Sequence, residues 1–238
     1  MGKELVGNVV DYLGRTYPGL DAAGGPDSPG SSGDPGAGSI GGNDVPRQLG
    51  TRQQLPMLNV QVDMDSREQI KESLFTGVKA VDVLTPIGRG QAQLVAGPTG
   101  AGKTQLCIDV VVGQRGAGVR CVYASVGSSR GQLARTVEQL RENGCLEYTT
   151  VVAATDDRPL GEQYAAMLTA CSIGEQHRDE GGHALVVLND VSVMVSERGA
   201  GSCLSGLAGL PASRVRLRMC GSMVRGEETG GGGGWQRC

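Results

Sequence analysis

Aromatic side chains, histidines and paired cysteines are scarce in this chain of 238 residues. Phe, Trp and Tyr make up 3% of the sequence, and only His177 and His183 carry an imidazole. The seven cysteines form no Cys-x-x-Cys pair, so the spacing typical of a structural zinc site is lacking. We therefore expect reduced and mostly buried thiols rather than a metal centre built on sulfur and imidazole.

Long apolar runs and an excess of one charge are also lacking. No run approaches the roughly 20 apolar residues that cross a bilayer, so direct membrane insertion is not expected. The chain opens with MGKELVGN, which has the character of neither a secretory signal nor an arginine-rich targeting peptide. Its 22 basic and 25 acidic side chains give a net charge of −3, which provides no positive field for a nucleic acid backbone. Nucleic acid is therefore not an expected partner.

Glycine is abundant instead, with 40 residues distributed unevenly along the chain. Residues 24–44 contain one aliphatic residue, Ile40, among Gly, Pro, Ser, Asp, Asn and Ala, and we expect a disordered insertion there. After Asp190 neither a helical nor a strand period persists, so we expect a tail of low order over 191–238. These two segments separate residues 1–23 from a predicted core at 45–190.

The core alternates short aliphatic runs with segments of helical period. Strands are predicted at 92–96, 119–124, 149–153 and 184–188, and helices at 103 to about 113, about 132 to 143, and about 161 to 171. Strands without polar alternation are typical of parallel sheets that are buried on both faces. The predicted fold class is thus α/β, with a parallel sheet that carries helices on both faces.

A phosphate-binding loop is predicted between the first of these strands and the first helix. Residues 97–104 read GPTGAGKT and fit the pattern G-x-x-x-x-G-K-[ST], in the strand-to-helix context that the pattern requires. In such a loop, backbone amides surround the phosphates, the lysine reaches the β and γ phosphates, and the hydroxyl binds Mg²⁺. The predicted nucleotide-binding residues are Gly97, Pro98, Thr99, Gly100, Ala101, Gly102, Lys103 and Thr104. The fold prediction therefore becomes an incomplete P-loop NTPase core of the RecA-like type.

The carboxylate that usually assists Mg²⁺ follows a hydrophobic strand, which here is Leu185–Leu188. Asn189 occupies the first position after it and carries no charge, while Asp190, one residue further, points to the opposite side if the strand continues. Thr104 and Asp190 are the candidate metal ligands, and we expect weakened binding of Mg²⁺.

Several stretches of the chain resemble the alpha subunit of the rotary, F-type ATP synthase. The string PIGRGQ at 86–91 is the most specific, within FTGVKAVDVLTPIGRGQ at 75–91. Similar stretches are Tyr123–Gly127 with Arg130, YTTVVAAT at 148–155 and CSIGEQHRDEGGHALVVLND at 171–190, the last in a mitochondrial or proteobacterial form. The segment VVDYLG at 9–14 is similar to the family's junction between barrel and nucleotide domain. The likeness covers about 74–190, is faint at 3–19 and 45–73, and ends at about 192.

The resemblance implies ATP or ADP with Mg²⁺ as ligands, beta-type subunits as partners, and a location on the matrix side of the mitochondrial inner membrane. It also implies that residues 1–23 are a remnant of the junction, and that the family's barrel, its helical C-terminal domain and its arginine finger are absent. Arg214 lies too soon after the Asn189 strand to be assigned the finger's role.

Departures from the family pattern indicate a non-catalytic subunit. Ser128 stands where the catalytic beta subunit has a water-positioning glutamate and alpha has a glutamine, and the loop lacks the glutamine usual in alpha. We therefore expect nucleotide to be held without being hydrolysed. Two alternatives remain open: a non-functional truncated gene product, and a stand-alone RecA-like ATPase whose base comes from Glu138, Glu142, Glu162 or Glu175.

Overall fold

A four-stranded parallel sheet forms the centre of the protein. The computed structural model describes residues 5–17, 20, 70–98, 100–189, 191 and 221–222. The strand order in the sheet is β1 (Val9–Val10), β6 (Thr149–Thr155), β5 (Val119–Ser128) and β7 (His183–Asn189). All three pairings are parallel. The strand β1 comes from the N-terminal segment, so residues far apart in sequence share one sheet.

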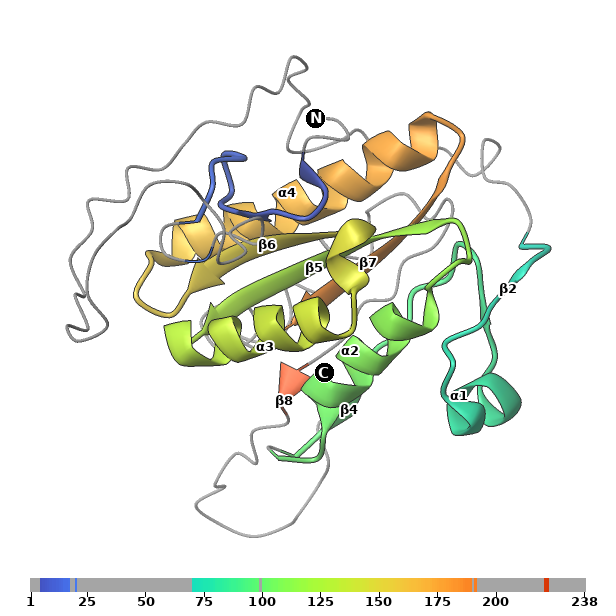
Figure 1. Ribbon diagram of the computed structural model, residues 1–238. Coiled ribbons are helices and arrows are strands. Elements are labelled where there is room, and N and C mark those ends of the chain that lie inside the picture. The colour runs from blue at the N-terminus through green and yellow to red at the C-terminus, as the bar shows by residue number, and fades with distance from the viewer. Residues whose placement is uncertain are drawn as a thin grey trace, which may run out of the picture.

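Helices cover both faces of this sheet (Figure 1). Helices α2 (Lys103–Gly113) and α3 (Arg130–Glu142) lie on one face, and α4 (Leu160–Asp179) lies on the other. The side chains of Tyr123, Val151 and Val187 belong to the apolar cluster that includes α2 and α3. Their neighbours one residue away, among them Val152 and Val186, belong to the cluster under α4. Because side chains alternate between the faces of a strand, the aliphatic runs supply both cores, and the predicted α/β fold class is confirmed.

The boundaries of helices α3 and α4 differ from the predicted ones. Helix α3 begins two residues earlier than predicted, because Ser129 and Gln132 form a reciprocal capping box. It ends before Gly144, which has the left-handed φ of 62° and is followed by a short 3-10 turn, η3 (Cys145–Glu147). Helix α4 continues eight residues beyond the predicted end at 171, and Gly174 within this extension packs closely against Val186 on β7. None of the helices in the described ranges is long and apolar enough to cross a membrane.

The strand predicted at 92–96 is almost absent from the structure. Only β4 (Ala96–Gly97) is a strand, and it pairs in parallel with β8 (Gly221–Ser222), outside the four-stranded sheet. Leu94 is 50% exposed, so the run Ala92–Ala96 is not buried on two faces as the interior strands are. The prediction of this strand was wrong because an aliphatic run becomes an interior strand only where a neighbouring strand is available to pair with it.

The segment that leads into the loop, residues 70–95, forms a small unit of its own. Strand β2 (Ser73–Leu74) pairs antiparallel with β3 (Ile87–Gly88), and α1 (Lys79–Leu84) connects them. Asp82 closes this unit by accepting hydrogen bonds from the amide and hydroxyl of Thr76, at 2.8 and 2.7 Å, and from the amide of Gly77 at 3.1 Å. Burial acts to raise the pKa of Asp82, but these hydrogen bonds outweigh it and the pKa lies below its ordinary value. The ionised carboxylate therefore holds the start of α1.

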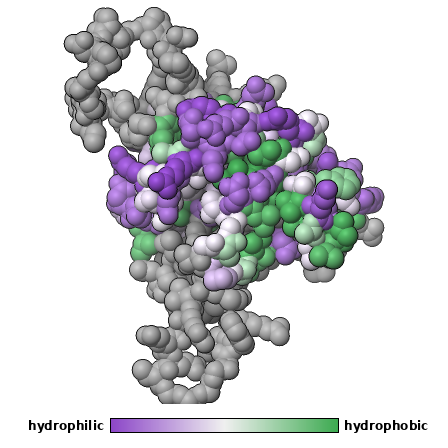
Figure 2. All heavy atoms as spheres, turned by 60° about the horizontal axis from the view of Figure 1, so that its bottom comes forward, coloured by the Kyte–Doolittle hydropathy of each residue, from purple (hydrophilic) through white to green (hydrophobic). Residues whose placement is uncertain are grey.

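Apolar side chains are exposed on this lead-in segment. Phe75, Val83 and Leu84 are 73%, 77% and 78% exposed, and α1 buries none of its residues. Figure 2 shows hydrophobic side chains gathered on the side of the molecule where α1 lies. An apolar patch of this kind is unusual on an isolated soluble domain and is typical of an interface.

The lead-in segment is attached to α2 by a close contact between backbones. Gln114, which follows α2, donates from Nε2 to the carbonyl of Phe75 at 2.8 Å. A Cβ added at Gly113 would lie 2.4 Å from the carbonyl oxygen of Thr76, whereas one added at Gly131 on α3 meets no atom within 4 Å.

A pair of glycine-to-alanine variants tests this attachment. We expect Gly113→Ala to lower the free energy of unfolding by about 1–3 kcal/mol, because a backbone neighbour must shift. Gly131→Ala is expected to raise it by about 0.5–1 kcal/mol, since alanine is the better helix former. Urea unfolding followed by circular dichroism measures both, and a stabilised Gly113→Ala variant would contradict the close contact.

Candidate functional site

The loop at 97–104 turns sharply from β4 into the first turn of α2. Gly102 is the N-cap of α2 and has a left-handed φ of 82°, as does Gly100. A Cβ at either position would meet no atom within 4 Å, so glycine is required there for its backbone conformation rather than for space. The amide of Ala101 donates to the carbonyl of Pro98 at 3.3 Å and closes the turn. Thr99 lies outside the described residues.

The side chain of Lys103 folds back over this loop. Its Nζ donates to the carbonyls of Gly97, at 3.0 Å, and Pro98, at 2.8 Å. Lys103 is also the first residue of α2, whose N-terminus carries a partial positive charge and amides without intrahelical partners. The ammonium and the helix end thus concentrate positive charge beside the loop, which is the arrangement that binds phosphate oxygens.

Asn189 reaches the same place from the end of β7. In the register of the sheet Asn189 lies opposite Ser125 of β5, on the face that α2 covers. Its Nδ2 donates to the hydroxyl of Tyr123 at 2.8 Å and lies 3.5 Å from Oγ1 of Thr104. The parallel strands therefore bring the Asn189 amide onto the first turn of α2, at the carboxyl edge where ligands bind in sheets of this type.

Two serines complete this edge of the sheet. The Oγ atoms of Ser125 and Ser128 are 2.6 Å apart at the end of β5, where the register with β6 shifts between Val126 and Ser128. Both side chains are neutral hydroxyls without a strong base beside them in these contacts. The group that Ser128 presents can form hydrogen bonds, but it cannot take a proton from water at neutral pH as a carboxylate can.

The four glutamates considered for a stand-alone ATPase are not brought to the loop. Glu138 is paired with Arg141 on α3 at 2.8 Å, and Glu142 is the last residue of that helix. Glu162 faces Arg158 at 3.8 Å, and Glu162 and Glu175 belong to α4, which lies on the opposite face of the sheet from α2.

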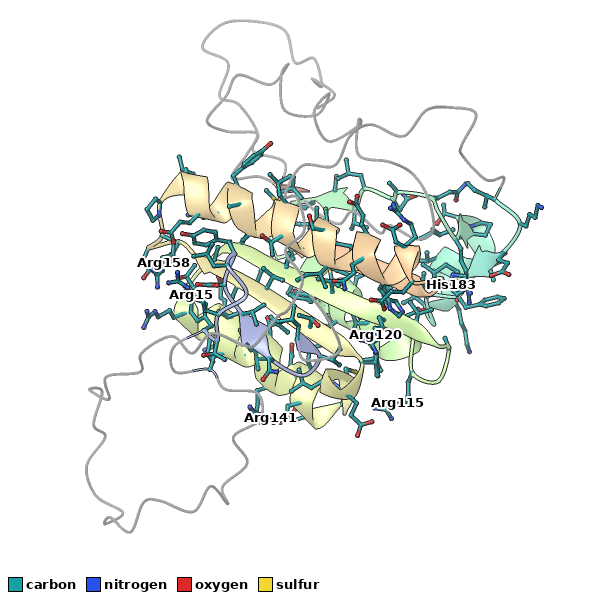
Figure 3. The ribbon with its side chains drawn as sticks, turned by 90° about the horizontal axis from the view of Figure 1, so that it is seen from above. Arg15, Arg115, Arg120, Arg141, Arg158 and His183 are labelled. Carbon is teal, nitrogen blue, oxygen red and sulfur yellow. The ribbon has the colours of Figure 1, made fainter. Side chains whose placement is uncertain are left out.

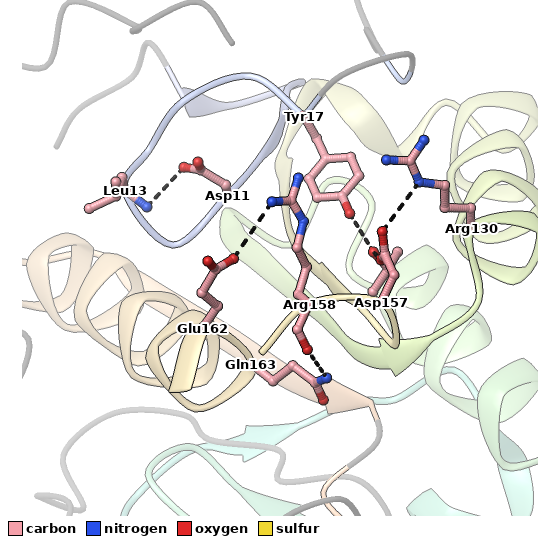
Figure 4. Close-up of polar contacts among 9 residues, drawn as sticks. Asp11, Leu13, Tyr17, Arg130, Asp157, Arg158, Glu162 and Gln163 are labelled. Carbon is pink, nitrogen blue, oxygen red and sulfur yellow. Dashed lines mark hydrogen bonds and ion pairs between the residues drawn. The ribbon is translucent and has the colours of Figure 1, made fainter. Parts of the chain in front are cut away.

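A second group of polar side chains lies where β6 ends (Figure 4). The hydroxyls of Tyr17 and Thr155 are 2.6 Å apart, and Thr155 donates to the carboxylate of Asp157. The hydrogen bond from Thr155 holds the pKa of Asp157 below its ordinary value, and Arg130, with Nε 4.0 Å from Oδ2, adds to that effect. A hydrogen bond with Tyr17 raises the pKa of Arg158. These contacts attach the N-terminal segment to the sheet, and the sequence had not indicated them.

Figure 3 labels side chains that lie at the two opposite ends of the sheet. Arg15 and Arg158 lie at one end, beside the start of α4, and Arg120 and His183 lie at the other. Burial and the neighbouring Arg120 lower the pKa of His177, which lies with Arg120 at the amino end of the strands. The loop and Asn189 are therefore at the opposite end from the two histidines.

Of the predicted metal ligands, only Thr104 can be located. Asp190 lies outside the described residues, and within the ranges that are described no three His, Cys, Asp or Glu side chains could hold a metal ion together. The polar residues missed by sequence reasoning are Tyr123 and Ser125. They follow the buried Cys121 by two and four positions in β5, so their side chains lie on the same face of the strand. This spacing is the signal that could have placed them on the α2 face.

A parallel sheet with helices on both faces, and a Gly-Lys-Thr loop that opens α2, define the class of P-loop nucleotide-binding domains. The family model of the ATP synthase alpha/beta family, nucleotide-binding domain, matches residues 77–214. The chain belongs to this family. The match runs beyond about residue 192, where the resemblance in the sequence had appeared to end.

Relatives among the curated proteins include alpha subunits of ATP synthase from several bacteria. The chain is 46% identical to the subunit from Desulfotalea psychrophila over 127 residues, which are 53% of this chain and 25% of the relative. It is 39% identical to that of Aquifex aeolicus and 35% to that of Neisseria meningitidis, each over 192 residues or 81% of this chain, and 33% and 32% of the relatives. The predicted resemblance to an alpha subunit is confirmed. The chain spans between a quarter and a third of the length of these relatives.

The expected mitochondrial location is wrong. The relatives are alpha subunits of bacteria, among them Desulfotalea, Aquifex, Lawsonia and Neisseria. The location had been inferred from the resemblance alone, in which the segment at 171–190 has a mitochondrial or proteobacterial form.

Proposed function

We propose that this chain is a nucleotide-holding, non-catalytic alpha-type part of a bacterial rotary ATP synthase. The observation that carries the proposal is the position of Lys103, at the N-terminus of α2 and over the carbonyls of Gly97 and Pro98. The phosphates of ATP or ADP would bind to the backbone amides of residues 97–104 and to the Lys103 ammonium. The nucleotide-binding core would be the predicted range 45–190, of which the structure describes 70–98 and 100–189.

The absence of catalysis follows from the groups beside the loop. Hydrolysis requires that the phosphates are bound, that a water is oriented, and that the developing charge is stabilised. The loop provides the first requirement, while Ser128 and Ser125 offer only neutral hydroxyls to each other at 2.6 Å. The chain would therefore hold its nucleotide and contribute to ATP synthesis only together with other subunits.

Beta-type subunits are the proposed partners, and the cytoplasmic side of a bacterial membrane is the proposed location of the ring. The relatives are named as alpha subunits of ATP synthase, which supports this assembly, and the exposed Phe75, Val83 and Leu84 offer an apolar surface for it. The alternative of a stand-alone ATPase lacks comparable support. None of its candidate bases is placed beside the loop in the described part of the chain: Glu138, Glu142, Glu162 and Glu175.

Calorimetry and a phosphate-release assay on the purified chain test the proposal together. We expect binding of ADP and ATP, and a turnover of ATP far below about 1 s⁻¹, the lower end of ordinary enzyme turnover. A turnover near that value would refute the non-catalytic assignment, whereas failure to bind either nucleotide would refute the proposed site.

A further inference from the structure

The Asn189 amide takes the place at the end of β7 where a carboxylate would support Mg²⁺. Its Nδ2 lies 3.5 Å from the Thr104 hydroxyl and donates to the Tyr123 hydroxyl at 2.8 Å. The pairing of Ser125 with Asn189 fixes this position, since β5 and β7 stay in register from Val119 to Ser125. The pairing of β5 with β7 therefore positions the Asn189 amide beside Tyr123 and Thr104.

Among the described residues, Asn189 and Thr104 give a Mg²⁺ ion no carboxylate at this point. Magnesium binds oxygen ligands, usually one or two carboxylates together with water and phosphate. In these contacts Asn189 presents its amide nitrogen, which is a donor, and the amide as a whole lacks the negative charge of a carboxylate. Directed at Oγ1 of Thr104 from 3.5 Å, the nitrogen also takes up one of the two lone pairs of the hydroxyl that would bind the ion.

The phosphates can be neutralised without the metal. Lys103 supplies a full positive charge beside Gly97 and Pro98, and α2 begins at the same residue with unpaired amides directed toward the loop. Because these donors are part of the chain, their contribution does not depend on the concentration of a cation.

We infer that this site binds nucleotide with little dependence on Mg²⁺, because Asn189 brings a neutral amide donor to the Thr104 hydroxyl where a carboxylate would support the metal. The inference rests on the proposed function, since the loop at 97–104 must bind nucleotide for its metal dependence to exist. It also specifies the ligand as the nucleotide itself rather than its magnesium complex.

Calorimetric titration with ADP and with ATP, each in excess Mg²⁺ and in EDTA, tests the inference. For the wild-type chain the two affinities are expected to agree within about threefold. For Asn189→Asp the ratio of the affinity in Mg²⁺ to that in EDTA is expected to rise by about tenfold, because a charged acceptor strengthens the metal side and repels the bare phosphates. Asn143→Asp makes the same charge change at the exposed C-cap of α3 and is expected to leave the ratio as in wild type.

Electron paramagnetic resonance of Mn²⁺ gives a second readout on the same proteins. With ADP present, the wild-type chain is expected to immobilise no more Mn²⁺ than ADP alone, while Asn189→Asp immobilises more. A wild-type affinity that falls tenfold or more in EDTA, or Mn²⁺ immobilised by the wild-type chain, overturns the inference and leaves the proposed function intact. If neither nucleotide binds in either buffer, the proposed function falls and the inference with it.

Discussion

Replacement of Lys103 by alanine is expected to lower the affinity for ADP and ATP by at least about a hundredfold, because each charge-assisted hydrogen bond to a phosphate contributes about 1.5–3 kcal/mol. The ammonium lies 3.0 and 2.8 Å from the carbonyls of Gly97 and Pro98, so it is already at the mouth of the loop. The backbone amides and the α2 N-terminus remain in the variant, which leaves a weak residual site. Isothermal titration calorimetry in Mg²⁺ and in EDTA measures the loss.

Lys79→Ala is the matched control for this prediction. Lys79 is exposed at the start of α1, in the lead-in segment. Its replacement by alanine removes the same charge from a place outside the loop. The affinities of this variant are expected to stay within about twofold of wild type, since an exposed charge outside the loop is screened by salt. If Lys103→Ala bound nucleotide within about threefold of wild type, the loop would not be the phosphate site.

Arginine at position 103 separates charge from geometry. Lys103→Arg keeps the positive charge but replaces a compact ammonium by a planar guanidinium, which does not fit the two carbonyls in the same way. We expect an affinity between those of wild type and Lys103→Ala. Circular dichroism should show all three variants folded, because the contacts of Lys103 are with its own loop and not with the core.

The elements predicted well are those whose signal is local. Helix α2 was predicted with its observed bounds, because the loop motif and the following aliphatic run occupy one stretch of sequence. The strands β5, β6 and β7 are each built around a short aliphatic run, as expected when both faces of a parallel strand are buried. The phosphate loop could be predicted for the same reason, since its eight residues are contiguous.

The features that were missed depend on pairing between distant segments. Val9–Val10 forms β1 only because β6 offers an edge to it, and 92–96 is not an interior strand because its pairing partner is the distant β8. The contact of Tyr123 with Asn189 joins residues 66 positions apart and depends on the parallel register of β5 and β7. Such a register has no local signature, so the sequence indicated only the lost charge at Asn189 and not the hydrogen bonds that replace it.

The core under α2 provides the largest expected effect on stability. Leu185 is fully buried on β7, in the cluster that joins the sheet to α2 and α3. We expect Leu185→Ala to lower the free energy of unfolding by about 3–4 kcal/mol, through lost burial and the cavity left behind. That is a large part of the stability of an ordinary domain, about 5–15 kcal/mol. Urea unfolding followed by far-ultraviolet circular dichroism measures the change.

Leu160→Ala supplies the comparison, because Leu160 begins α4 and is 46% exposed. Its expected loss is below about 1 kcal/mol, since little surface leaves water there on folding. Leu185 lies four residues before Asn189 and faces the core, so folded Leu185→Ala is expected to bind nucleotide within about threefold of wild type. Equal losses of stability in the two leucine variants would mean that β7 is not packed against α2, and the position of the Asn189 amide beside Thr104 would then lose its support.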